Sequence, residues 1–167
     1  MAPEFAQILS RSSVLNILPA PSHEELPSYL RGADILLLPE SFNPKHANTN
    51  RLAVSSKSHL YMMSERPVLV YAPSETGVAE YAKREGWACL VETEGKAPLA
   101  GALLKLATDE VLQEKLVARG VEVARQNHDE AVIREKIRRA LSSAAFIDDR
   151  AGGSAIPPHA TERGPTD

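Results

Sequence analysis

The run DILLLP at residues 34–39 constrains the fold most, because its apolar residues follow one another without polar alternation. Such a run is typical of a parallel strand buried on both faces. Three further short apolar runs predict strands at residues 14–18, 67–71 and 88–91. Helix signals lie between these runs. The sequence therefore predicts the α/β class, with a parallel, Rossmann-like sheet of about four strands flanked by helices.

The helix signals are local and specific. Ser22 followed by Glu25 forms a capping box, which predicts a helix over residues 23–31. Two more helices are predicted between the strands, over residues 57–63 and 76–84. Because strands and helices alternate, each crossover is expected to be right-handed.

From Pro98 onward the pattern is helical only. Leucines recur at helical spacing over residues 99–106, and Asp109 and Asp129 are each placed to cap a further helix. These C-terminal helices are expected to pack on the sheet.

The chain is long enough for one domain with a core of its own. Residues 1–13 are a poorly patterned N-terminal segment, and residues 14–145 carry the alternating pattern and the closing helices. Residues 146–167 combine glycine, proline and mixed charges with few apolar side chains, which predicts a disordered tail.

Composition narrows the class of protein. The net charge of −3 gives no basic field for nucleic acid. One cysteine, Cys89, allows no internal disulfide, and His46 and His59 have no cysteine or carboxylate at ligand spacing, so no metal site is predicted. No apolar run approaches the ~20 residues of a membrane span, and the N-terminus lacks a signal-peptide pattern. We expect a cytoplasmic protein.

The most informative stretch is residues 51–73, RLAVSSKSHLYMMSERPVLVYAP. It predicts a serine-rich turn (residues 51–57), a short helix that opens on Ser55, Ser56 and Lys57, and then a buried strand. Backbone N–H groups, two hydroxyls and an ammonium at the positive end of a helix favour a phosphate group. The simpler alternative is an ordinary helix start with a solvated lysine.

The ordered set of residues LPSYLRGADILLLP followed by SSKSHLYMMSERPVLVYAPSETGVAEYAKREGWACLVE resembles the C-terminal half of GT-B fold glycosyltransferases. In the variants it resembles most, a Pro-Thr-Lys-Leu-x-Glu-Tyr run leads to a Gly-x-Pro-Val-Leu segment and a long helix. Ser55, Ser56 and Lys57 stand where Pro-Thr-Lys would be, and Pro67 opens the matching strand. The resemblance covers about residues 14–141.

The resemblance implies a domain that binds a nucleotide diphosphate sugar for glycosyl transfer to an acceptor. It assigns the donor diphosphate to Ser55, Ser56 and Lys57 with Arg51, and the nucleotide base to the loop Pro19, Ala20 and Pro21. It implies no cofactor, and it names no catalytic residue in this chain. The general base would come from a separate acceptor-binding domain or chain. The family's donor half also has a further first strand, so the chain is expected to be partial.

Three positions depart from the family pattern and favour an alternative. Leu52 and Leu60 stand where a pair of glutamates would contact ribose and sugar, and a buried leucine cannot accept a hydrogen bond. Glu65 stands in place of a glycine before Pro67. The alternative is a degenerate, non-catalytic Rossmann-like binding or interaction module. A receiver domain is disfavoured, because no acidic cluster lies at the strand ends.

Overall fold

The structure is a computed structural model that describes residues 12–46 and 51–151. The chain divides into two compact units, Met1–Ala124 and Arg125–Asp167. The elements follow in the order α2 (Leu26–Arg31), β1 (Leu36–Pro39), the 3-10 turn η1 (Pro44–His46), α4 (Lys57–Met63), β2 (Val68–Tyr71), α5 (Gly77–Glu85), β3 (Cys89–Val91), α6 (Lys96–Thr108), α7 (Glu110–His128) and α8 (Glu130–Ala151).

The sheet has three parallel strands in the order β1-β2-β3. Leu36 of β1 lies opposite Val68 of β2, and Leu69 of β2 lies opposite Cys89 of β3. The predicted α/β class and parallel sheet are confirmed.

The predicted strand at residues 14–18 is absent, so the described part of the chain contains three strands instead of about four. Residues 14–18 form no regular element, and four of their side chains, those of Val14, Leu15, Ile17 and Leu18, are 48–87% exposed. An apolar run becomes a strand only where another strand pairs with it, and the sheet offers this run no partner.

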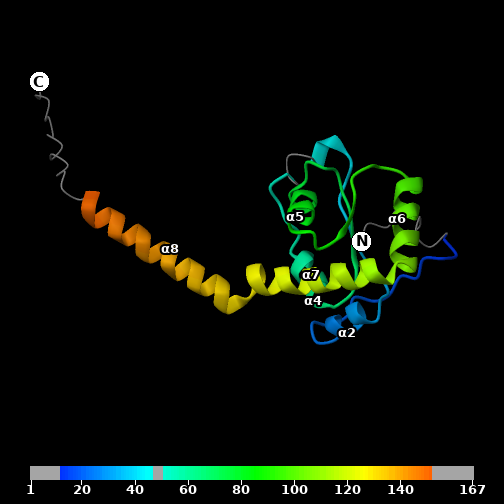
Figure 1. The fold of residues 1–167 in the computed structure, drawn as a ribbon, viewed down its shortest axis with the longest axis horizontal. Coiled ribbons are helices and arrows are strands. Elements are labelled where there is room, and N and C mark those ends of the chain that lie inside the picture. The colour runs from blue at the N-terminus through cyan, green and yellow to red at the C-terminus, as the bar shows by residue number, and fades with distance from the viewer. Residues whose placement is uncertain (1–11, 47–50, 152–167) are drawn as a thin grey trace, which may run out of the picture. The chain divides into compact units, whose positions relative to one another are not determined.

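Helices cover both faces of the sheet, with α5 on one side and α6 on the other (Figure 1). The first face carries alternate strand residues, such as Leu36 and Val70, which pack on α4, α5 and the end of α7 near Val123. The second face carries Leu69 and Val91, which pack on α6 and the start of α7. This alternation is what a parallel sheet buried between two helical layers requires.

The edge strand β1 differs from the sequence expectation. Its burial alternates, and Leu37 on the second face is 40% exposed, so β1 is not buried on both faces. The reason is its position, since α6 contacts β2 and β3 but β1 lies beyond them at the edge.

Caps define the helix boundaries. Ser22 and Glu25 exchange the predicted bonds, with Ser22 N–H to Glu25 Oε2 at 2.9 Å, but the regular helix α2 begins only at Leu26. Asp109 Oδ1 accepts from the N–H of Leu112 at 2.9 Å, and Asp129 Oδ1 accepts from Val132 at 3.1 Å. The predicted aspartate caps are confirmed.

In the second unit, α8 continues to Ala151, past residue 146 where the sequence predicts the tail to begin. No helix in the described ranges is both long and apolar enough to cross a membrane.

Candidate functional site

The candidate site lies at the carboxyl edge of the sheet. Because the three strands are parallel, their carboxyl ends meet at one edge, and the loops after them lead into the N-termini of α4, α5 and α6. Ligands of open parallel sheets bind outside this edge.

The serine-rich turn occupies the first of these loops. Ser56 is the N-cap of α4, and its side chain makes no capping hydrogen bond. Ser55 accepts the hydrogen bonds at the start of the helix instead. Its Oγ accepts from Lys57 N–H at 3.3 Å, and its carbonyl oxygen accepts from Ser58 N–H at 2.9 Å. The predicted helix at residues 57–63 is confirmed.

The predicted diphosphate ligands are accessible. Arg51, Ser56 and Lys57 are exposed and Ser55 is half-buried. Ser58, one residue further on, is buried, and its Oγ has no hydrogen-bond partner among the described atoms. The turn therefore presents two cationic side chains and a hydroxyl to solvent.

The start of α5 lies directly against this turn. A Cβ atom placed on Gly77 would stand 2.8 Å from the carbonyl oxygen of Ala53. Thr76 is the N-cap of α5 and accepts from Ala79 N–H at 3.4 Å through its Oγ1. Two helix N-termini therefore meet at the same part of the sheet edge.

The sequence patterns did not reveal two further contacts at this edge, an aromatic pair and a partly buried hydrogen bond. The rings of Phe42 and Tyr71 lie 4.7 Å apart between centroids, and the Tyr71 hydroxyl accepts from the N–H of Gly95 at 2.8 Å. This bond ties the end of β2 to the start of α6. The only local signal was a tyrosine at a strand end and a phenylalanine in a polar loop.

The two leucines at the family's glutamate positions are not buried, which corrects the sequence expectation. Leu52 is 90% exposed, and Leu60 is 39% exposed on α4. Leu60 borders a cavity of about 320 Å³ between α2 and the C-terminal half of α4, together with Leu26 and Met63. Neither leucine offers an oxygen to a sugar hydroxyl.

The predicted base loop, Pro19, Ala20 and Pro21, is irregular and mostly exposed. His23, which follows this loop, lines the cavity between α2 and α4 together with Leu60. The role of the loop in base binding stays a prediction.

Glu65, which precedes Arg66 and Pro67 just before β2, has a left-handed backbone conformation. Its φ of 60° makes it the one non-glycine residue with positive φ in the described ranges. A residue with a Cβ atom is strained in this left-handed region, and glycine is not.

Two ionisable side chains near the sheet, Cys89 and Tyr61, have raised pKa values. Burial raises the pKa of the Cys89 thiol, and Lys105 opposes this shift, so the thiol is protonated at neutral pH. Burial likewise raises the pKa of Tyr61. Among the side chains that the structure describes, no three of the histidine, cysteine, aspartate and glutamate type gather closely enough to hold a metal ion.

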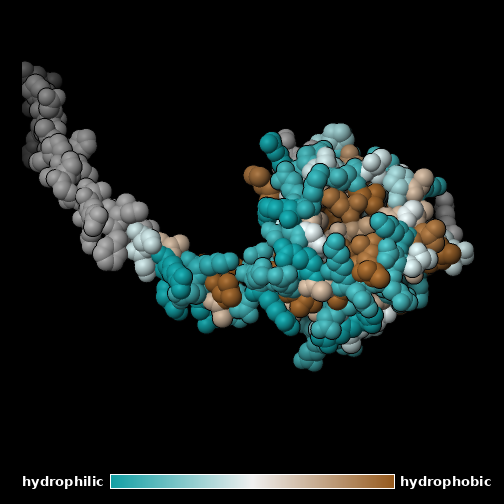
Figure 2. All heavy atoms as spheres, in the orientation of Figure 1, coloured by the Kyte–Doolittle hydropathy of each residue, from teal (hydrophilic) through white to brown (hydrophobic). Residues whose placement is uncertain are grey.

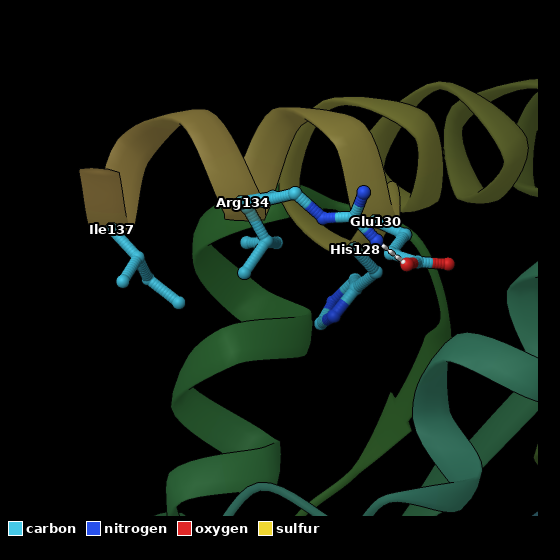
Figure 3. Close-up of a pocket in the computed structure, with 5 residues that line it drawn as sticks. His128, Glu130, Arg134 and Ile137 are labelled. Carbon is cyan, nitrogen blue, oxygen red and sulfur yellow. Dashed lines mark hydrogen bonds and ion pairs between the residues drawn. The ribbon is translucent and has the colours of Figure 1, made fainter. Parts of the chain in front are cut away.

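A second cavity, of about 450 Å³, lies in the C-terminal unit where α7 gives way to α8 (Figure 3). Its lining combines His128, Ile133 and Ile137 with the ion pair Glu130–Arg134. Figure 2 shows the apolar patch of α8 in the same unit. The Glu130 carboxylate and the Arg134 guanidinium neutralise each other, so this cavity attracts a charged ligand less strongly than the serine-rich turn does.

Comparison with known proteins identifies no relative: no protein-family model matches the chain, and neither the curated proteins nor the solved structures contain a significant match.

Proposed function

We propose that this chain is the donor-binding part of a GT-B type glycosyltransferase, and that it binds the diphosphate of a nucleotide sugar at Ser55, Ser56 and Lys57. One observation carries the proposal. The serine-rich turn opens α4 at the carboxyl edge of a parallel sheet, and the start of α5 lies against it. Phosphate groups bind at such an edge because N–H groups and helix dipoles favour negative charge there.

The chemistry assigned to the chain is electrostatic. When the glycosyl bond breaks, negative charge develops on the nucleoside diphosphate that leaves. The ammonium of Lys57 and the guanidinium of Arg51, both exposed at the turn, would stabilise this charge. The base that activates the acceptor would belong to a separate acceptor-binding domain or chain.

The strand topology supports a partial domain. In the doubly wound order 3-2-1-4-5-6, strands β1, β2 and β3 would correspond to strands 4, 5 and 6. Strand 1 would then pair with the free edge of β1, and residues 14–18 would be strand 3, whose neighbour is strand 2. The described residues would then lack both strand 1 and strand 2, and not only the first strand that the resemblance leads us to expect, which accounts for an apolar run that stays unpaired.

The single cysteine, Cys89, allows no disulfide within the chain, which is compatible with a reducing compartment, so the proposed location is the cytoplasm.

Thermal unfolding in the presence of millimolar UDP, GDP, ADP or dTDP tests the proposal. A ligand that binds only the folded state stabilises it by about 2.7 kcal/mol at a hundred times its dissociation constant. We expect one of the four nucleotides to raise Tm, and Lys57→Ala to abolish the rise. Lys115→Ala, which removes an exposed lysine from α7, is the matched control and should keep it.

A cooperative unfolding transition that none of the nucleotides shifts would refute donor binding. A shift that survives Lys57→Ala and Arg51→Ala together would place the nucleotide elsewhere on the chain.

The exposed leucines favour a second candidate, a non-catalytic interaction module. Leu52 and Leu60 put exposed apolar side chains where donor contacts are expected, and such a side chain can contribute to a protein contact but cannot bond a sugar hydroxyl. In this case nucleotides leave Tm unchanged, and Leu52→Glu weakens self-association or partner binding measured by analytical ultracentrifugation.

A further inference from the structure

The start of α5 and the serine-rich turn approach each other through backbone atoms. A Cβ atom on Gly77 would lie 2.8 Å from the oxygen, 3.1 Å from the carbonyl carbon and 3.2 Å from the nitrogen of Ala53. Three contacts with one peptide segment, all of them to backbone, cannot be relieved by rotating a side chain. Any residue other than glycine at position 77 forces one of the two segments to move.

The α5 side of this contact is held firmly. Thr76 is buried, its hydroxyl donates to the Pro73 carbonyl at 2.8 Å, and its own carbonyl accepts from Glu80 N–H at 3.0 Å. The next residues, Val78 and Ala79, are fully buried against the sheet. The start of α5 therefore cannot retreat without breaking the core.

The opposite side of the contact is held weakly. Ala53 and Val54 lie in an exposed, irregular segment, and the helix that follows has no side-chain cap. Added bulk at position 77 would thus displace the serine-rich turn and leave α5 in place.

We propose that Gly77 is a positioning residue for the nucleotide: by lacking a side chain, it lets the serine-rich turn rest on the start of α5, which fixes Ser55, Ser56 and Lys57. The inference rests on the proposed function, because those three residues are its diphosphate ligands. Gly77 acts through Ala53 and touches no ligand itself.

The variant Gly77→Ala tests the inference in the full chain. We expect hydrogen exchange of the Lys57 and Ser58 amides, which donate to Ser55, to accelerate while the strands β1 to β3 keep their protection. The dissociation constant of the nucleotide that stabilises the wild type should rise at least about tenfold, as small misplacements of binding groups do. Gly101→Ala is the matched control, since a Cβ atom there meets nothing within 4 Å.

Unchanged exchange at the Lys57 and Ser58 amides, or an unchanged dissociation constant in Gly77→Ala, would overturn the inference while the proposed function stands. If none of the four nucleotides binds the wild type, the proposed function fails and the nucleotide-positioning role fails with it.

A wild-type measurement keeps the inference testable if Gly77→Ala does not fold. The nuclear Overhauser effect between a Gly77 α-proton and the Ala53 amide proton should be strong, because the position of the absent Cβ lies 3.2 Å from the Ala53 nitrogen. If this nuclear Overhauser effect is absent in the folded wild type, Gly77 and Ala53 are not in contact and the inference is wrong.

Discussion

Helices α4 and α5 follow neighbouring strands of one sheet and begin at the same edge, yet their ends are built differently. At the start of α5, Thr76 is buried and caps the helix with its hydroxyl. At the start of α4, Ser56 is exposed and makes no such bond. Four residues of α5 are buried, against two of α4.

The C-terminal ends of α4 and α5 also differ in how well their residues suit the local backbone conformation. Each helix is followed by a residue in the left-handed region, which lets the chain turn back toward the next strand. After α5 this residue is Gly86, with φ 69°, and after α4 it is Glu65, with φ 60°. Glycine occupies this conformation freely, and glutamate is strained in it.

The comparison indicates that α5 is built for stability and that α4 departs from the local rules at both ends. Such departures in folded proteins concentrate at functional sites. Four substitutions at the ends of the two helices test this difference, and the effect of each can be measured as a change in the free energy of unfolding in urea.

The largest effect is expected for Thr76→Ala. Loss of the cap, of the bond to the Pro73 carbonyl and of a buried methyl group should destabilise the protein by about 2 kcal/mol. Thr76→Ser keeps the hydroxyl and should cost less than half as much. Equal costs for the two variants would show that the hydroxyl does not cap α5.

Gly86→Ala should destabilise the protein by about 1.5 kcal/mol, because the alanine would have to adopt a positive φ. A Cβ atom at this position meets nothing within 4 Å, so the cost is one of backbone conformation and not of packing. A cost near zero would mean that α5 ends in another conformation.

Glu65→Gly should stabilise the protein by about 1 kcal/mol, since it removes the same strain from the end of α4. Glu65→Ala is the control, because it removes the charge and keeps the Cβ atom, and it should give no such gain. Equal stability changes in the two variants would trace the effect to charge.

Ser56→Ala should change stability by less than about 0.5 kcal/mol, as is usual for an exposed residue that makes no cap. The same variant is expected to weaken nucleotide binding, which isothermal titration calorimetry would measure. A stability loss as large as that of Thr76→Ala would make Ser56 a structural cap and remove the contrast between the two helices.

Local patterns were enough to predict most elements. The unbroken apolar runs predicted β1, β2 and β3 within two residues of their observed bounds, and the α4 bounds were predicted correctly. The strand predicted at residues 14–18 is absent, because apolarity is a local property whereas a strand needs a pairing partner from elsewhere in the chain.

The site was predictable only in part, for the same physical reason. Ser55, Ser56 and Lys57 follow one another, so the helix start that they form was visible in the sequence. The approach of Gly77 to Ala53, and the bond from Gly95 to Tyr71, join positions 24 residues apart in each pair. No periodicity or motif reports such contacts.

The edge strand β1 has a consequence for the behaviour of the chain at high concentration. Three consecutive leucines, Leu36 to Leu38, lie on an edge whose backbone groups another chain can pair with. Asp34 precedes them with a charge, and Pro39 ends them with a residue that has no N–H to donate. We expect these two residues to act as aggregation gatekeepers, because a charge and a missing N–H limit the length over which a foreign strand can add.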